Sequence, residues 1–314
     1  MKNSTARTDV VLAGLALVDV IGRPVDIHHP PRRGGLQVME SMTLTTGGNV
    51  ANCGIDLAKL GFRVGAISRI GDDPLGDFVL RHLAKYRVQT SGVTIDRKAQ
   101  TSATFVAVEK GGERTFFHTR GCLRSFRVAD IMKHLPLIAR TKIFALGYLG
   151  LLPECEPHLP RLFAAVKLRT GAATLLDTGG NPRKNPGLLK RILPYVDYFI
   201  PSREEAAILT GASSPAGMVQ TFRAWGARGV VGIKLGSDGC YITDGDRAAT
   251  LPAVKVRRVV DATGAGDAFV AGFLAATLRG FAPLDAARRA NAIAASCVTA
   301  VGASTAIKPF DDYR

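Results

Sequence analysis

The sequence has 314 residues, of which 46% are hydrophobic and 21% are charged, and its formal net charge is +15 at pH 7. This composition excludes a disordered chain and suits one large α/β domain or two small ones. The positive charge is compatible with nucleic-acid binding or with a field that attracts anionic substrates. The basic residues are scattered in twos and threes without a long basic run, so we expect no nucleic-acid partner.

The cysteines and the apolar segments bear on the cellular compartment of the protein. Five cysteines at irregular spacing, with no C-x-x-C, argue against a disulfide framework or a zinc site and predict reduced thiols in the cytoplasm. No segment reaches the roughly 18 apolar residues of a membrane helix, so we expect no membrane partner. The apolar run Val10 to Val18 is interrupted by Asp19 and lacks a cleavage site, which favours a buried first strand over a signal peptide.

The first third of the chain is predicted to alternate strands and helices. The expected elements are a strand over residues 10–18, an exposed excursion over 22–35, a helix over 50–60, a strand over 64–70 and a helix over 75–86. A Gly-Gly pair precedes the first helix, and Asp73 followed by proline precedes the second. Both are typical of helix starts.

Two runs that alternate polar and apolar residues flank Lys110-Gly111-Gly112-Glu113, which predicts a β-hairpin over residues 101–118. Together with the preceding excursion it would form a small separate sheet. From residue 140 onward, apolar runs at 142–146, 173–177, 195–201 and 230–235 are separated by helical patterns. Such alternation predicts a parallel sheet with helices on both faces.

The segment Asp261-Ala-Thr-Gly-Ala-Gly-Asp267, directly before an apolar helical pattern, carries the strongest chemical signal. Its glycines and the helix start leave backbone N–H groups free to bind an anion, most naturally a phosphate. Phosphoryl transfer needs a carboxylate beside such a site, where it orients the attacking hydroxyl and takes its proton. An acid in the first turn also serves as a helix cap, so the segment alone leaves both roles for Asp267 open.

This segment resembles the C-terminal signature of the ribokinase-like, or PfkB, carbohydrate kinases. Further similarities to the family lie at Gly47 to Gly61, Gly71 to Gly76, Gly112 to Thr115 and Lys234 to Gly239, so the resemblance spans nearly the whole chain. It implies one α/β domain over residues 1–314, a three-layer sandwich with a central, mostly parallel sheet. A small β-sheet lid would come from about residues 15–45 and 98–121.

The resemblance implies an ATP-dependent kinase that phosphorylates a hydroxyl of a sugar or sugar-like molecule. Asp267 would be the catalytic base, and the backbone of Gly264, Ala265 and Gly266 would form the anion hole. The residues implied to bind the substrate are Asp19, Gly47, Gly48 and Asn52.

The resemblance also assigns cofactor residues. Lys234, Gly236 and Gly239 would border ATP, with Asn291 near the adenine. Glu205 would position Mg²⁺ through water, although Ser202 stands where the family often has Asn. Asp261 and Thr263 would adjoin a monovalent-cation site, for which K⁺ is the candidate. A homodimer through the lid is implied as well.

Departures from the family pattern keep other functions open. Ribokinases often carry Asn and Lys where this chain has Leu17 and Asn49, which weakens ribose and leaves room for a nucleoside kinase. Arg120 and Arg183 could meet an acidic sugar or be solvated surface residues. The alternative from another class is a non-catalytic sugar or nucleic-acid binder with the kinase fold. Retention of Asp267 and its glycines argues against it.

Overall fold

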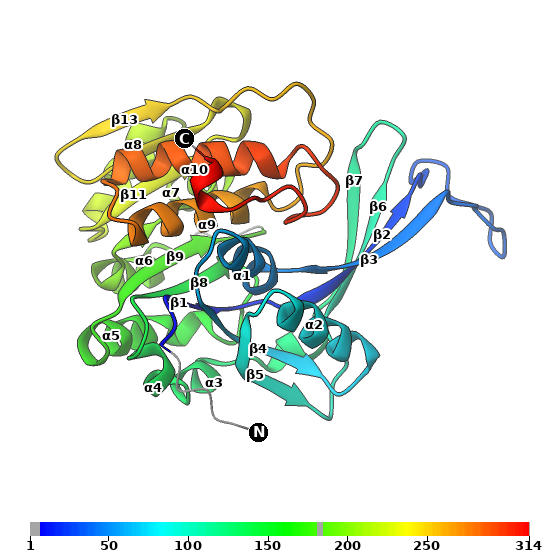
Figure 1. The fold of residues 1–314 in the computed structure, drawn as a ribbon, viewed down its shortest axis with the longest axis horizontal. Coiled ribbons are helices and arrows are strands. Elements are labelled where there is room, and N and C mark those ends of the chain that lie inside the picture. The colour runs from blue at the N-terminus through cyan, green and yellow to red at the C-terminus, as the bar shows by residue number, and fades with distance from the viewer. Residues whose placement is uncertain (1–6, 181–184, 314) are drawn as a thin grey trace.

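A nine-stranded sheet runs through the middle of the molecule in the computed structural model, which describes residues 7–180 and 185–313 (Figure 1). The strand order is β13-β12-β11-β10-β9-β8-β1-β4-β5. Neighbours from β11 to β5 are parallel, and β12 and β13 are antiparallel. The strands are β1 (Val10–Ala13), β4 (Val64–Gly71), β5 (Gln89–Asp96), β8 (Ile143–Leu149), β9 (Ala173–Thr178), β10 (Tyr198–Phe199), β11 (Val230–Lys234), β12 (Cys240–Thr243) and β13 (Ala248–Leu251).

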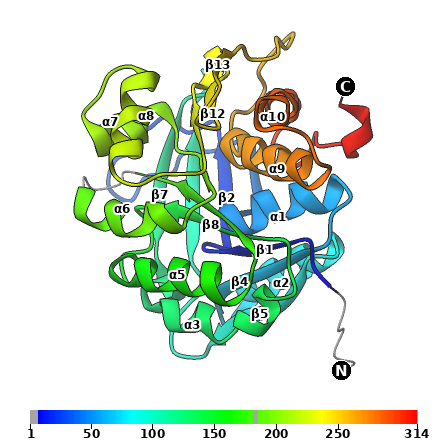
Figure 2. The same ribbon diagram turned by 90° about the vertical axis from the view of Figure 1, so that its left-hand side faces the viewer.

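Helices cover both faces of this sheet and complete a three-layer sandwich (Figure 2). One face packs on α1 (Asn49–Lys59), α2 (Pro74–Lys85), α9 (Ala265–Leu278) and α10 (Pro283–Cys297). The other face packs on α3 (Val128–Met132), α4 (Leu135–Ile138), α5 (Leu159–Arg169), α6 (Pro186–Ile192), α7 (Arg203–Thr210) and α8 (Pro215–Ala224). The predicted α/β class with a mostly parallel sheet is confirmed. None of the helices described is long and apolar enough to cross a membrane.

Strand β1 shows how the sequence produces the two faces. Val10 and Leu12 belong to the core on one side of the sheet, and Val11 and Ala13 to the core on the other. Because successive side chains of a strand point to opposite faces, an uninterrupted apolar run is what a strand buried on both sides requires.

A separate four-stranded sheet, the lid, projects from the edge of the sandwich, at the right of Figure 1. Its strands, in the order β3-β2-β6-β7, are β3 (Ser41–Gly47), β2 (Leu17–Arg23), β6 (Ala103–Val108) and β7 (Arg114–Thr119). Three of them lie within residues 15–45 and 98–121, and β3 extends two residues past 45. The pair β2–β6 is parallel, and the other two pairs are antiparallel.

The single strand predicted over residues 10–18 is wrong, because the chain changes sheets within it. Strand β1 belongs to the main sheet and ends at Ala13, while β2 begins at Leu17 and belongs to the lid. Gly14 lies at the break with φ of 139°, and a Cβ there would come within 2.4 Å of the Asn49 side chain. Only glycine fits both that conformation and that approach.

The side chain of Asn49 fastens α1 to the break between the two sheets. Its Nδ2 donates to the carbonyl of Ala13 at 3.0 Å, and its Oδ1 accepts from the N–H of Leu15 at 2.9 Å. Both bonds are buried, and they lie where β1 ends at Ala13 and the chain continues toward β2. Asn49 therefore satisfies the backbone where the chain leaves the main sheet.

We expect Asn49→Ala to destabilise the protein by about 2–4 kcal/mol, because it removes two hydrogen bonds and leaves a buried carbonyl and a buried N–H unpaired. Urea unfolding followed by circular dichroism measures the change. Ser214→Ala, which removes an exposed cap of α8, is the control and should cost about 1 kcal/mol. Equal losses for the two variants would contradict the role given to Asn49.

Candidate active site

Helix α9 begins at Ala265 with Gly264 in the left-handed conformation, φ 76°. A Cβ on Gly264 would lie 2.3 Å from the Cβ of Ala303, so glycine is required both for the turn and for the packing. In the described part of the chain, the N–H groups of Gly264, Gly266 and Asp267 have no hydrogen-bond partner, whereas that of Ala265 donates to Ala262 at 3.3 Å. Three free donors at the positive end of a 14-residue helix make an anion site.

Asp267 lies in the first turn of α9 and is 5% exposed. Its Oδ2 accepts hydrogen bonds of 2.9 Å from Nδ2 of Asn52 and from the hydroxyl of Tyr148. Among the described residues no donor reaches Oδ1, which is left for a ligand. Burial raises the pKa of Asp267, and the bonds from Asn52 and Tyr148 and the charge of Lys234 counteract that rise.

Tyr148 is a site residue that the sequence reasoning missed. It follows Gly147 near the end of β8 and has φ of 64°, a conformation that is uncommon for a residue with a side chain. The strained backbone aims its hydroxyl at Asp267. The glycines on either side of Tyr148 and Leu149 were the available signal, since they mark a strand end that departs from regular geometry.

A largely buried lysine and two carboxylates gather beside the anion site. Lys234, at the end of β11, donates to both oxygens of Asp177 at 2.7 and 2.9 Å. The pKa of Asp177 is still raised to about 7, first by burial, with the charge of Glu205 adding to it against that of Lys234. A Cβ on Gly266 would lie 3.6 Å from Nζ of Lys234. The lysine therefore lies next to the helix start, where an anion would bind.

Glu205 is held at the start of α7 by a capping box with Ser202. Its Oε2 accepts from the N–H of Ser202 at 3.0 Å and from the hydroxyl of Thr178 at 2.5 Å. Serine thus fills the position where the family often has Asn by acting as the helix cap. No described donor reaches Oε1, which is available to a water or a hydrated cation.

Asp19 lies on β2 of the lid, close enough to Asp267 for the two charges to interact. Burial raises its pKa to about 6, with a bond from Thr104 lowering it and the charge of Asp267 raising it. A Cβ on Gly47 would lie 2.2 Å from an oxygen of Asp19, and one on Gly48 would lie 2.4 Å from the carbonyl of Leu15. Both glycines are therefore needed for close packing of the backbone, and their contact with a substrate stays a prediction.

The strand register places further polar groups beside Asp19. Thr45 on β3 and Thr104 on β6 lie opposite Asp19, and His118 on β7 lies opposite Thr104. Nδ1 of His118 lies 3.0 Å from the hydroxyl of Thr104. This row on the inner face of the lid was not predicted, because its members come from four separate strands.

The predicted ATP residues lie farther along the same side of the sheet. Gly236 and Gly239 have φ of 60° and 96° in the turn between β11 and β12, and a Cβ on Gly239 would meet the carbonyl of Leu251 at 2.1 Å. Nδ2 of Asn291 donates to Pro252 at 3.0 Å and Leu251 at 3.3 Å. The amide of Asn291 thus joins α10 to the end of β13, and its place near an adenine stays a prediction.

The two substitutions that left room for a nucleoside kinase lie at the start of β2 and of α1. Leu17 is buried and shares a face of β2 with Asp19, and the amide of Asn49 bonds to the backbone of Ala13 and Leu15. The nucleoside kinase stays an open alternative. Arg120 is exposed, while Arg183 lies outside the described residues.

Comparison with known proteins agrees with this geometry. Residues 7–309 match the family described as "pfkB family carbohydrate kinase". This chain belongs to the pfkB family of carbohydrate kinases. It is 28% identical to a 2-dehydro-3-deoxygluconokinase of Bacillus subtilis over 90% of this chain and 89% of that protein. It is 31% identical to a fructokinase of Klebsiella pneumoniae over 85% of this chain and 90% of that protein.

Solved structures show the same fold. Arabidopsis thaliana ribokinase complexed with ribose and ATP aligns with a TM-score of 0.82 at 23% identity, over 98% of this chain and 97% of that one. A putative ribokinase II from E. coli in complex with ATP and Mg²⁺ has a TM-score of 0.82 at 22% identity, over 97% of each chain. The ribokinase-like sandwich predicted from the signatures is confirmed.

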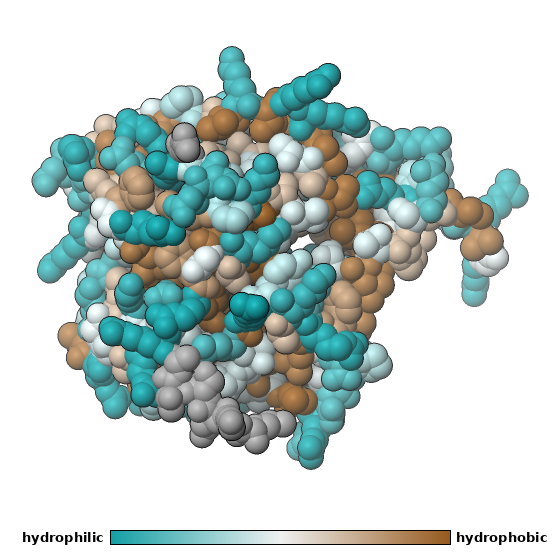
Figure 3. Space-filling model, in the orientation of Figure 1, coloured by the Kyte–Doolittle hydropathy of each residue, from teal (hydrophilic) through white to brown (hydrophobic). Residues whose placement is uncertain are grey.

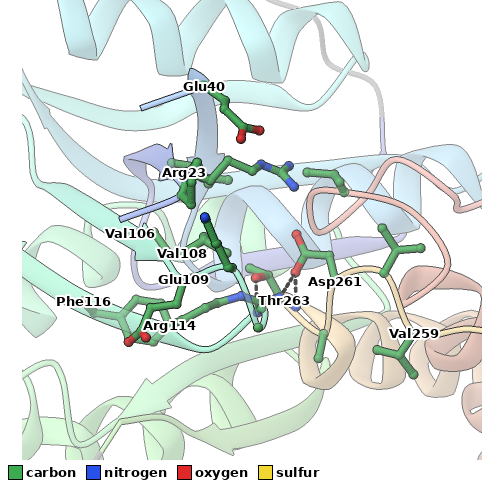
Figure 4. A pocket seen from close by; sticks show the side chains of 18 of the residues that line it. Arg23, Glu40, Val106, Val108, Glu109, Arg114, Phe116, Val259, Asp261 and Thr263 are labelled. Atoms are coloured by element: carbon green, nitrogen blue, oxygen red, sulfur yellow. Dashed lines mark hydrogen bonds and ion pairs between the residues drawn. The ribbon is translucent and has the colours of Figure 1, made fainter. Parts of the chain in front are cut away.

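In this pfkB kinase, the two residues predicted to adjoin a cation site, Asp261 and Thr263, both contact Arg114 (Figure 4). Nη1 of Arg114, from the lid, donates to the hydroxyl of Thr263 at 2.6 Å, and its Nη2 pairs with Oδ1 of Asp261. The same Oδ1 accepts from the N–H of Thr263 at 2.7 Å, and Oδ2 accepts from Gly302 at 2.9 Å. The carboxylate therefore already carries the positive charge of Arg114, with which a bound K⁺ would have to compete.

We expect kcat/KM of the kinase for its sugar to rise with pH through about 6, because Asp19 must be ionised to accept bonds from substrate hydroxyls. The direction follows from the raised pKa: below it the carboxyl is neutral and loses acceptor capacity. Steady-state kinetics from about pH 5 to about pH 8 measure the profile. In Asp19→Asn the rise should be smaller, since an amide does not titrate. A flat wild-type profile would contradict the assignment.

Proposed function

We propose that this protein transfers the γ-phosphoryl group of ATP to a hydroxyl of a sugar or sugar-like small molecule, with Asp267 as the base. The observation that carries the proposal is the position of Asp267. Its carboxylate is fixed through Oδ2, its Oδ1 is left for a ligand, and it stands in the same helical turn as free N–H donors. Few other reactions need an acceptor of a proton directly beside an anion site.

The position of each group around Asp267 suits it to a separate role in the transfer. Asn52 and Tyr148 orient the carboxylate, so that Oδ1 can accept the proton of the attacking hydroxyl. The N–H groups of Gly264 and Gly266 stabilise charge on the phosphoryl group, and Lys234 adds a positive charge beside them. Asp267 is a weak base even with its raised pKa. A loose transition state tolerates this, because positioning contributes most of the rate.

Mg²⁺ fits the acidic side of this site. Asp177, Glu205 and Asp267 are three buried carboxylates around one lysine, and the pKa of Asp177 is raised to about 7. Oxygen-rich, net negative surroundings suit a hydrated hard cation. Bound Mg²⁺ would neutralise charge on the ATP phosphates, and Glu205 would hold it through water by way of Oε1.

For the acceptor we propose a monosaccharide or a sugar acid. The support is the polar inner face of the lid around Asp19 and the names of the two relatives, a 2-dehydro-3-deoxygluconokinase and a fructokinase. ADP release should be measured with Tris-ATP and Mg²⁺ across hexoses, pentoses, sugar acids and nucleosides. Turnover of one sugar or sugar acid is expected. Turnover of a nucleoside alone would overturn this choice of acceptor.

Asp267→Asn should lower kcat by about 10²-fold or more while ATP binding is kept, because general-base roles contribute about 10²–10⁴-fold. The measurement is steady-state kinetics, with calorimetry for the nucleotide. The amide can still accept the bond from Asn52 and Tyr148 through its oxygen, so the fold should persist. Glu204→Gln, on the same acidic side at the start of α7 but exposed, is the control and should stay near wild type. Activity of Asp267→Asn within a few-fold of wild type would remove Asp267 from its role.

We also propose that two lids pair to form a homodimer in the cytoplasm. Across the outer face of the lid, Leu44, Val20, Phe105 and Phe117 form one cross-strand row, and Leu44 and Phe117 are 46% and 58% exposed. Hydrophobic residues are visible along the lid at the right of Figure 3. Such a row is costly to leave in water and suits a second copy of the same sheet. The five buried, unpaired cysteines support a reducing compartment.

Phe117→Glu should convert the dimer to a monomer, because a charge in the middle of the apolar row would have to be buried on pairing. Light scattering after gel filtration measures the mass. Leu168→Glu replaces a 76% exposed apolar residue on α5, away from the lid, and should leave the dimer intact. A monomeric wild type at micromolar concentration would contradict the proposal.

A further inference from the structure

We propose that Arg114 supplies the positive charge beside Asp261 and Thr263 in place of a monovalent cation, so that the lid itself fixes the loop leading into the anion site. This inference rests on the proposed kinase function for its kinetic test, and its second test is independent of that function. Arg114 is the first residue of β7, at the tip of the lid hairpin, and lies 147 residues from Asp261 in sequence.

Arg114 is largely buried and makes two specific contacts, unlike a solvent-exposed surface arginine. Its side chain is 19% exposed and that of Asp261 is 8% exposed, so the pair is largely removed from water. One guanidinium nitrogen meets the carboxylate and the other meets the hydroxyl of Thr263 (Figure 4). The planar fork of arginine matches two acceptors on one loop, which a point charge cannot do.

The charge of Arg114 opposes a second positive charge at these acceptors. Asp261 has one negative charge, and its two oxygens already receive the N–H groups of Thr263 and Gly302 in addition to the guanidinium. Burial would raise the pKa of Asp261, but these donors and the charge of Arg114 bring it below its usual value. A cation arriving at the same oxygens would meet an unscreened like charge in a poorly solvated place.

The loop that Arg114 holds is coupled to the anion site. Asp261 and Thr263 immediately precede Gly264, whose conformation sets the direction of the first free N–H groups of α9. The bond from Gly302 to Asp261 and the packing of Gly264 on Ala303 join this loop to the segment after α10. Arg114 thereby connects the lid, which also carries Asp19, to the residues that would bind phosphate.

A cavity of about 760 Å³ separates the rest of the lid from this loop. It is lined by Ile21, Val106 and Phe116 from the inner face of the lid and by residues 258–263. Arg114 crosses from one wall to the other, as Figure 4 shows. The contact therefore joins the two walls of this cavity, and it exists only while the lid lies against the main domain.

The kinetic test compares wild type with Arg114→Ala and Arg114→Lys. Assays use Tris-ATP with either KCl or tetramethylammonium chloride at equal ionic strength. Wild type should change by less than about twofold between the salts. Arg114→Ala should lose about 10²-fold in kcat/KM without K⁺, the loss typical of a group that fixes an oxyanion donor, and should recover about tenfold or more with K⁺ or low-millimolar guanidinium.

Two further variants separate this role from a merely structural one. Arg114→Lys keeps the charge without the fork and should fall between wild type and alanine, with little response to K⁺. Arg97→Ala removes an arginine that is 86% exposed and should match wild type in both salts. A purely structural Arg114 would give an alanine variant that guanidinium and K⁺ do not rescue, which would overturn the proposal.

Thermal unfolding provides a readout that needs no substrate. An ion that binds only the folded state raises Tm. Exchange of tetramethylammonium for K⁺ should raise Tm of Arg114→Ala, where the acceptors are released, and leave wild type unchanged. A K⁺-specific rise in wild type, or strong K⁺ activation of wild type, would overturn the proposal. A wild type that turns over no sugar would count against the kinase function, while the Tm comparison would still decide the role of Arg114.

Discussion

Asp267 is a carboxylate held out of water, and most of the site compensates for that burial. Desolvation of an acid is unfavourable unless donors or positive charge replace the lost water. Here Asn52 and Tyr148 donate to one oxygen, Lys234 lies nearby, and the start of α9 contributes its dipole. Each donor comes from a different element, so the arrangement exists only when α1, β8, β11 and α9 are packed together.

The order of the sheet makes that packing possible. In a parallel sheet, all strands end at one edge, and polar residues that follow buried strands meet there. Tyr148, Asp177 and Lys234 stand at the ends of β8, β9 and β11, which neighbour one another or are one strand apart. Close approach then decides where glycine is needed: Gly47 beside Asp19 and Gly264 beside Ala303 have no room for a Cβ.

What the sequence predicts well is what neighbouring residues determine. The helix start with its glycines and Asp267, and the Gly-Gly pair before α1, are local, and their residues lie where the site forms. Pairs far apart in sequence escaped prediction: Tyr148 with Asp267, Lys234 with Asp177, and Arg114 with Asp261. Each depends on tertiary packing that no spacing encodes. The break at Gly14 was missed for the same reason, since an uninterrupted apolar run hides a change of sheet that only the contact with Asn49 reveals.

The lid contributes to the site in two ways that differ in their dependence on closure. Asp19 is carried by β2, two residues from the end of that strand that joins the main sheet through a short tether fixed by Asn49. Arg114 is at the tip of the lid hairpin and bridges a cavity, so its contact with Asp261 is the part most sensitive to lid position.

A lid that closes over a substrate excludes water, which would otherwise compete as phosphoryl acceptor. If the same movement brings the guanidinium to the loop before α9, the anion site becomes fully ordered only when the acceptor is enclosed. An ion bound permanently at Asp261 would order that loop whether or not a sugar were present. An arginine carried by the lid therefore links phosphate binding to enclosure of the substrate. The link depends on the attachment of the charge to the lid, because an arginine and a bound monovalent ion carry the same charge.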